Sequence, residues 1–473
     1  MRLLIPTSFL MLALAAAAAP AAAQTAPARP MPIFGLPDAG VFSGGVPTGR
    51  RTDAPLPLTL ADAIARGLQH NLGVISREAD VDMARGGRWQ ALSGVLPTVS
   101  GRIAENREVI NLAALGFSGF SGVPSIIGPF SVFDARLFVS QPVVDANGLF
   151  RLRESIQSLS AARHGYRNAR DLVTLAVTTL YLQAIASDSR VAVARAQLDT
   201  AEALARLARD RKQAGLVPAI DVLRAEVQLQ SERQRVIVAE NTSAKQKLAL
   251  ARAIGLPLGQ AVAIADAMPD APARVPALDD AVQQAYAHRE DLQGAQAAVR
   301  AAEAGQRAAF GEHLPSLHVD ANWGPIGESA STAIPTYTVA TTVRVPLFTG
   351  TGRAHVIQAD ATLRRRRAEL DDARARVYYE VQAALLDVQA AEAQAEVSAR
   401  AVSLAEQQLV QARDRFAAGV ADTIEVVQAQ EALAGAHDSR IASLYGYNAA
   451  KAALAGAIGL AEEEMPRFLG GRP

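Results

Sequence analysis

The chain has 473 residues, half of them hydrophobic, with 47 basic side chains against 47 acidic ones and no cysteine. The neutral balance argues against a nucleic-acid-binding protein, because binding along a phosphate backbone requires a concentration of positive charge. The missing cysteine excludes disulfides, thiolate metal ligands and cysteine nucleophiles.

Residues 1–23 have the composition of a cleaved secretory signal peptide. Arg2 supplies the positive start, an apolar stretch follows, and alanines precede the cleavage site. A membrane-spanning anchor is the alternative, but Pro6 and Pro20 disfavour a continuous spanning helix. Without cysteine, we expect a mature N-terminus that is not lipidated. No later apolar run reaches the roughly 18 residues that a spanning helix needs, so a membrane crossing would have to use strands.

Residues 24–57 are rich in proline and glycine and show no periodic apolar pattern. They predict an extended N-terminal arm and no packed element. The chain then contains two copies of one pattern, offset by 204 residues: Gly215 recurs as Gly419, and Ile254-Gly255-Leu256 recurs as Ile458-Gly459-Leu460. Two copies of equal length indicate that both satisfy the same physical constraint.

Each copy predicts two short helices, two strands and one long helical hairpin. In the first repeat these segments are 58–95, about 98–141 and 148–255, followed by a linker at 256–276. In the second repeat they are 277–313, about 316–346 and 352–459, followed by a C-terminal tail at 461–473.

The predicted strands alternate between apolar and polar residues with a period of two. In one strand Leu137 and Val139 alternate with Arg136 and Ser140. Strands of about ten residues with this alternation suit the wall of a transmembrane barrel, although a soluble sandwich hairpin would look similar. The segment 108–131 is either a loop or part of longer strands. In a barrel, the polar face would line the interior and would include Asp134, Arg136, His318, Asp320 and Arg344.

The long hairpins are the largest predicted elements. Residues 353–418 contain no glycine or proline, and 149–214 repeat this stretch with only Gly165 inside. A shorter returning helix follows Gly215 and Gly419, so we expect the short helix pairs to complete the missing length. Leucine and valine seven residues apart indicate a coiled-coil seam, at Leu363, Leu370 and Val377. The remaining polar surface favours a hollow wall of helices over a globular core.

The signal peptide, the duplicated plan and the hairpin turns resemble the TolC family of bacterial outer-membrane efflux proteins. The turns are Ala-Gly215-Leu-Val-Pro-Ala-Ile-Asp221 and Ala-Gly419-Val-Ala-Asp-Thr-Ile-Glu425. The resemblance implies a homotrimer with a 12-stranded barrel in outer-membrane lipid and a helical tube in the periplasm of a Gram-negative bacterium. It also implies a periplasmic adaptor protein and an inner-membrane pump of RND, ABC or MFS type. Four strands per chain can close in lipid only with other copies.

The resemblance also implies roles for the hairpin turns. The adaptor would dock on Gly215, Leu216, Gly419 and Val420. Glu425 and Asp221 would line a periplasmic constriction, six carboxylates in a trimer. Helix capping is the simpler explanation for both acids, since each opens a returning helix. Where the best-studied members carry a second acid, this chain has Gln428 and, in the first repeat, Arg224, so the acidic ring would be weaker.

No catalytic motif is present, and we expect neither enzymatic activity nor a cofactor or metal site. The run Arg364 to Arg367 is better explained as a solvated helix face than as a partner site. The sequence therefore predicts a passive exit duct of a tripartite efflux or type I secretion system. A secreted or periplasmic coiled-coil scaffold without a pore is the alternative.

Overall fold

The computed structural model describes residues 42, 44–116, 124–215, 217–272, 275–348, 350–421 and 423–469. They all belong to one compact unit within Leu36–Pro473. The predicted signal peptide, most of the N-terminal arm up to residue 41, and Leu216 lie outside the described residues.

The two repeats share one order of elements, to which the first adds the short helix η1 and the second adds a final helix. The first consists of β1 (Leu56–Leu58), α1 (Leu60–His70), α2 (Leu72–Ser93), β2 (Thr98–Asn111), the short helix η1 (Ala113–Leu115), β3 (Ile126–Val144), α3 (Ala146–Gln213) and α4 (Ala219–Ala253). The second consists of β4 (Val262–Ile264), α5 (Leu278–His288), α6 (Glu290–Gly311), β5 (Ser316–Gly327), β6 (Ile334–Arg344), α7 (Gly350–Ala417), α8 (Thr423–Ile458) and α9 (Ala461–Phe468).

Four strands form one antiparallel sheet in the order β2-β3-β5-β6. The strand period predicted this hairpin in each repeat. In the first repeat the strands are longer than expected: β2 continues to Asn111 and β3 begins at Ile126. Most of segment 108–131 that is described is therefore strand. The β2–β3 hairpin extends beyond the shorter β5–β6 hairpin, because β3 pairs with β5 only from Phe133 onward.

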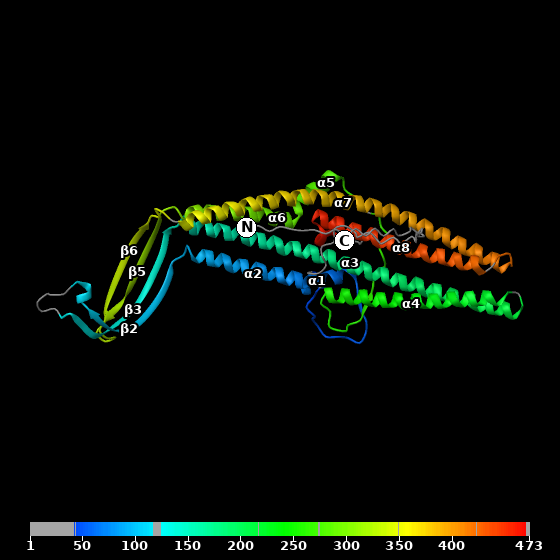
Figure 1. Cartoon of the computed structure of the whole chain (residues 1–473), viewed down its shortest axis with the longest axis horizontal. Helices are drawn as coiled ribbons and strands as arrows, with labels where there is room; N and C mark the ends of the chain where they lie inside the picture. The colour runs from blue at the N-terminus through cyan, green and yellow to red at the C-terminus, as the bar shows by residue number, and fades with distance from the viewer. Residues whose placement is uncertain are drawn as a thin grey trace, which may run out of the picture. The chain divides into compact units, whose positions relative to one another are not determined.

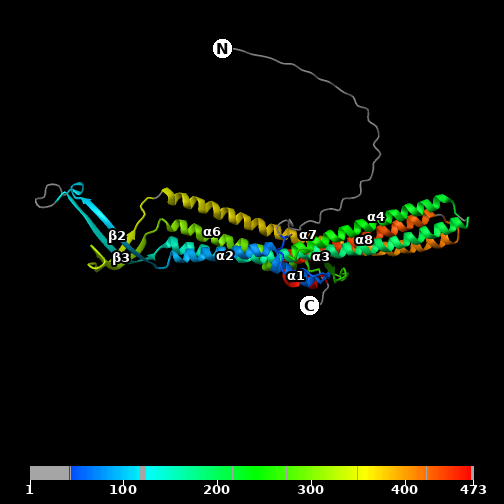
Figure 2. The same cartoon turned by 90° about the horizontal axis from the view of Figure 1, so that it is seen from below.

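The long helices α3 and α7 have 68 residues each, and their returning partners α4 and α8 have 35 and 36. As expected, the short helices supply the remaining length: α2 and α6 pack against α3, and α6 also packs against α7 (Figure 1, Figure 2). The two hairpins touch through α3 and α8. None of the described helices is long and apolar enough to cross a membrane.

The buried seams of these helices are rich in alanine, which lets their backbones approach closely. Val377 of α7 is 1% exposed, and Leu363 and Leu370 of the same predicted seam are buried as well. The largest buried cluster lies where α1, α3, α4 and α8 meet. It includes the fully buried Tyr181, whose hydroxyl donates to the carbonyl oxygen of Leu58 at 2.8 Å.

The two ends of the described chain are more ordered than the sequence indicated. Within the predicted arm, β1 pairs in parallel with β4, and the N–H of Val46 donates to the carbonyl of His70 at 2.8 Å. Gly45 lies so close to Gly255 that a Cβ atom would meet its backbone nitrogen at 2.6 Å. The predicted C-terminal tail contains α9, whose Met465 is fully buried. The sequence did not predict these segments because the first is rich in proline and both are short. Contacts with residues distant in the sequence stabilise them.

Candidate functional site

One face of the four-stranded sheet is polar and the other is apolar. The strand pairing of Ser140 with Asp320 and of Ser316 with Arg344 defines the polar face. It carries all five side chains predicted from the sequence: Asp134, Arg136, His318, Asp320 and Arg344. On the opposite face, Leu137, Trp323 and Tyr337 are level with one another across three strands, and all three are exposed.

Several polar-face side chains bind each other. Arg136 Nε donates to Asp134 Oδ1 at 2.6 Å, and Arg102 of β2 reaches the same carboxylate at 3.4 Å. Ser140 Oγ donates to Asp320 Oδ1 at 2.6 Å. Among the described strands, the opposite face has no such network and is mostly apolar, apart from Glu105 and Arg107 toward the far end of β2.

The hairpin turns follow the ends of α3 and α7. Gly215 has a φ of +73° and Gly419 a φ of +74°, which favour glycine over any residue with a Cβ. The N–H of Gly419 donates to the carbonyl of Phe416, and that of Val420 to Arg415, so the last turn of α7 is closed. Val420 is 67% exposed.

Both predicted constriction acids lie in the first turn of a returning helix, and each contacts an arginine. Asp221 is buried and lies 3.3 Å from Arg224 Nη1. Glu425 Oε1 lies 2.9 Å from Arg415 Nε. The two repeats therefore use different partners: in the first the arginine follows the acid on α4, and in the second it comes from the end of α7.

Arg211, the repeat equivalent of Arg415, crosses from one hairpin to the other. Its Nη1 donates to the carbonyl of Phe416 at 2.9 Å and its Nη2 to that of Ala417 at 3.3 Å. The guanidinium also stacks on the Phe416 ring, 4.4 Å from the centroid. The sequence showed an arginine at this position in both repeats but could not show that the two diverge in partner.

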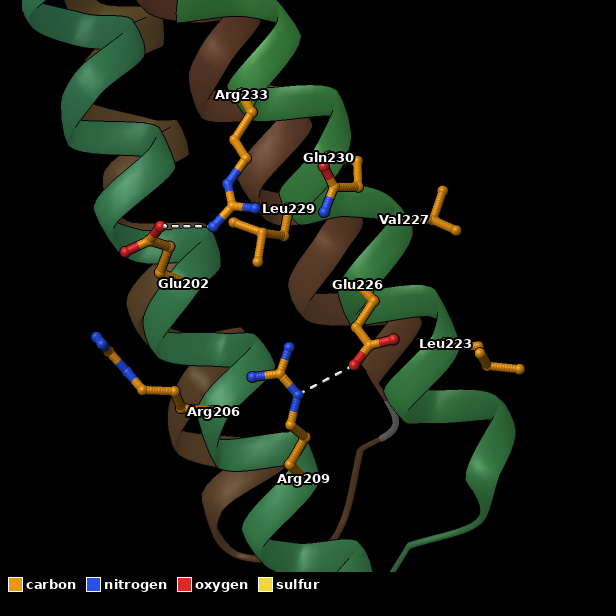
Figure 3. A pocket seen from close by; sticks show the side chains of 9 residues that line it. All are labelled: Glu202, Arg206, Arg209, Leu223, Glu226, Val227, Leu229, Gln230 and Arg233. Carbon is orange, nitrogen blue, oxygen red and sulfur yellow. Dashed lines mark hydrogen bonds and ion pairs between the residues drawn. The ribbon is translucent and has the colours of Figure 1, made fainter.

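A ladder of four ion pairs, here called the hairpin ladder, joins α3 to α4. Its members recur every seven residues with alternating sign: Asp188–Lys247 at 2.9 Å, Arg195–Glu240 at 2.6 Å, Glu202–Arg233 at 3.2 Å and Arg209–Glu226 at 3.0 Å. Figure 3 shows the last two pairs spanning the helices, within a groove of about 700 Å³. Leu223 and Val227 point away from α3 there.

The second hairpin does not repeat the ladder. The equivalents of Arg195 and Glu240 are Ala399 and Leu444, and the equivalent of Arg233 is His437. Ion pairs instead join α7 to α6 through Arg367–Glu303 at 2.9 Å, and to the residue before α6 through Arg289 and Glu380. The ladder thus lies in the turn-proximal half of α3, whereas Arg367 and Glu380 lie in the sheet-proximal half of α7.

A buried acid, Glu232 of α4, was missed by the sequence reading. It is 4% exposed, and its Oε1 accepts hydrogen bonds from Gln228 at 2.7 Å and from Arg235 at 2.9 Å. Burial raises the pKa of the Glu232 carboxyl. Within the described ranges, no group of three or more histidine, aspartate or glutamate side chains could hold a metal ion.

Known proteins share this arrangement. A family model described as outer membrane efflux protein matches residues 64–256 and 281–460. The pyoverdine export outer membrane protein OpmQ of Pseudomonas aeruginosa is 23% identical over 396 residues, which cover 81% of each chain. Protein CyaE of Bordetella pertussis is 26% identical over 390 residues, covering 79% of this chain and 78% of CyaE.

Solved structures agree on the fold. The CmeC outer membrane channel of Campylobacter jejuni superposes with a TM-score of 0.75 at 15% identity, covering 87% of this chain and 89% of CmeC. The outer membrane protein VceC of Vibrio cholerae gives a TM-score of 0.75 at 19% identity, covering 85% and 97%. With its matched family model, its strand pattern and its paired hairpins, the chain belongs to the outer membrane efflux protein family.

Proposed function

We propose that three copies of this chain associate head to tail into a closed duct that carries substrates passively out of the cell. Membership of the family makes the protein an outer-membrane efflux channel and not an enzyme. The family also implies, in general, a trimer that works with an adaptor and an inner-membrane pump. The observation that carries the specific arrangement is the pair of unpartnered edges on each chain.

The first kind of edge is in the sheet. In the order β2-β3-β5-β6, strands β2 and β6 each have a neighbour on one side only. In lipid, unpaired backbone N–H and C=O groups cost several kcal/mol each, so both edges require a partner strand. Pairing β6 of one copy with β2 of the next satisfies both, and three copies give twelve strands.

The second kind of edge is helical. On α4, apolar side chains opposite α3 are exposed, at Leu223, Val227 and Ile237. On α7, a matching row is exposed along the helix, at Leu386, Val397 and Leu404. Head-to-tail association brings α4 of one copy against α7 of the next and buries both rows. In a closed ring of three copies, every α4 face and every α7 face is therefore covered by a neighbouring copy.

In this assembly the apolar face of the sheet contacts lipid and the polar face lines the pore. His318, Asp320 and Arg344 would then face the lumen together with the Asp134–Arg136 pair. This supports a water-filled passage, since charged groups facing lipid would be costly.

The assembly is tested by mass and conductance. Purified protein in detergent should have the mass of three chains, and planar bilayers containing it should show ohmic single-channel currents. Because the chain has no cysteine, Val227→Cys with Leu404→Cys should cross-link to a covalent trimer, whereas each single variant should not. A monomer without conductance would overturn the proposal.

The adaptor is expected to dock on the hairpin turns. Gly215 and Gly419 hold turns that project beyond the helix ends, and Val420 presents an apolar side chain to solvent. Leu216 is the corresponding residue of the first turn. A cross-linker at Val420→Cys in intact cells should capture a periplasmic adaptor, and its companion pump of RND, ABC or MFS type would indicate the cargo. Val343→Cys, on the apolar face of the sheet, is the control and should capture none.

The constriction is proposed to include Glu425 and Asp221. Six such carboxylates around a trimeric opening favour cations, but Arg415 and Arg224 offset part of that charge. Glu425→Gln should therefore lower cation selectivity only modestly. An unchanged reversal potential in a salt gradient would remove Glu425 from the constriction.

A further inference from the structure

Exposed apolar side chains gather where the sheet meets the helices. We call this set the apolar rim; its members are Leu96, Val143, Val144, Leu314, Val345, Leu347 and Phe348. Leu347 and Phe348 are each 93% exposed, more than any other large hydrophobic residue described. The rim is duplicated, because Pro142-Val143-Val144 and Pro346-Leu347-Phe348 occupy equivalent positions in the two repeats.

Contact between copies does not account for the whole rim. Val144 ends β3 and Leu314 precedes β5, and both of these strands have strand neighbours on both sides within the chain. Strand pairing at the edges β2 and β6 therefore leaves these positions uncovered. Both are about half exposed.

The rim continues the apolar face of the sheet. Val144 pairs with Leu317, and Leu317 pairs with Val343. All three positions belong to the face that carries Trp323. Beyond β6, the connection to α7 carries Val345 and Leu347, and both side chains are exposed. Because the rim is continuous with the sheet face that is proposed to contact lipid, we expect the rim to contact lipid as well.

We propose that the apolar rim inserts into the periplasmic leaflet of the outer membrane, with lipid acyl chains around Leu347 and Phe348. The inference rests on the proposed barrel and goes beyond it, because it extends the lipid contact past the strand ends to the connections with α3 and α7. The rim sets how deeply the duct is seated in the bilayer.

Basic side chains lie just beyond the rim. Arg353 is exposed in the first turn of α7, and Arg153 is exposed seven residues after the start of α3. At 1.5 Å per residue these positions are about 5 and 10 Å along their helices. That is about the depth of a headgroup layer, where guanidinium groups bind lipid phosphate. Arg153 also lies over the Phe150 ring, 5.3 Å from its centroid.

The test is fluorescence quenching by lipid. The chain has two tryptophans, Trp89 and Trp323, so a Trp89→Phe/Trp323→Phe background allows one reporter at Phe348→Trp. The full-length trimer is placed in vesicles of phosphatidylcholine brominated near the glycerol end of its acyl chains, and in unbrominated vesicles. We expect the reporter at 348 to lose at least half as much fluorescence as Trp323 does in the Trp89→Phe protein. The matched control Thr342→Trp, on the polar face of β6, should lose little.

The outcomes are distinct. An unquenched reporter at 348 beside a quenched Trp323 overturns the rim contact while leaving the barrel intact. If Trp323 is also unquenched, the sheet is not in the bilayer and the proposed function fails with the inference. Efficient disulfide trapping of Phe348→Cys by Leu96→Cys of a neighbouring copy would assign the rim to the interface between copies and would also overturn the proposal.

Discussion

Lys247 and Lys451 occupy the same position in the two repeats, 204 residues apart, yet the first is partly exposed and the second is fully buried. Lys247 Nζ lies 2.9 Å from Asp188 in the hairpin ladder. Lys451 has no exposed surface, donates from Nζ to the carbonyl of Ala271 at 2.9 Å, and lies 4.4 Å from the centre of the Tyr447 ring. In the second repeat the lysine thus binds the backbone of the segment between β4 and α5.

Burial lowers the pKa of Lys451 to about 8, against a usual value of 10.5. Between these values the unfolded chain holds more protons than the folded one, so stability should rise with pH across that window. Lys451→Met should remove the rise, as measured by the thermal midpoint of the detergent-solubilised protein from pH 7.5 to 10.5. Lys247→Met is the control and should keep it, because Lys451 is still present. If the thermal midpoint changed with pH equally in wild type and in Lys451→Met, Lys451 would not be the group responsible.

Arg211 is expected to hold the two hairpin turns together. Arg211→Ala removes two charge-assisted hydrogen bonds and a stacked ring contact, together about 1–3 kcal/mol. The channel should then conduct more in the absence of an adaptor, and its turns should be cut faster by protease. Arg211→Lys should be intermediate, since an ammonium cannot reproduce the planar fork. The control Lys212→Ala, at the exposed neighbouring residue, should behave as wild type. If Arg211→Ala changed neither conductance nor protease sensitivity, Arg211 would not hold the two turns together.

The hairpin ladder should make a small, salt-sensitive contribution to stability. Glu202 and Arg233 are both partly exposed, so a double-mutant cycle with Gln at each should give a coupling of about 0.3–1 kcal/mol at low salt. It should shrink as salt screens the pair. The equivalent cycle at Glu406 and His437 in the second hairpin should give no coupling. Equal coupling in the two hairpins would contradict the asymmetry.

Asp171 should make docking of α9 sensitive to pH. Its Oδ1 accepts from the N–H of Glu462 at 3.1 Å, and burial, together with nearby acids, raises its pKa from 3.8 to about 6. The folded chain therefore holds the proton more tightly, and stability should fall as pH rises from about 4 to 6. Asp171→Asn keeps the acceptor and should restore up to about 3 kcal/mol at pH 7.

The thermal midpoint of Asp171→Asn between pH 4 and 7.5 provides the measurement. We expect wild type to be most stable on the acid side of this range, Asp171→Asn to lose that maximum, and Glu463→Gln, which leaves Asp171 in place, to retain it. A wild-type profile that rises steadily with pH would rule out Asp171 as the controlling group.

Local periodicity was sufficient to predict the strands, the long hairpins and the glycine turns. Period two in Phe133 to Val139 is typical of a strand with two unlike faces, and the long stretch without glycine or proline before Gly419 favours a long helix. The seam at Leu363 and Leu370 followed from the same reasoning. These features depend on near neighbours in the sequence, so the sequence carries them directly.

Contacts between distant segments required the tertiary structure. Arg211 and Arg415 look alike in the sequence, but the approach of the two hairpins brings Arg211 of α3 against the carbonyls of Phe416 and Ala417 at the end of α7. Arg415 instead pairs with Glu425. The proline-rich residues before α1 became a strand only because β4 offers them backbone partners. Such contacts depend on which surfaces of distant segments pack together, and that packing is decided only by the complete fold.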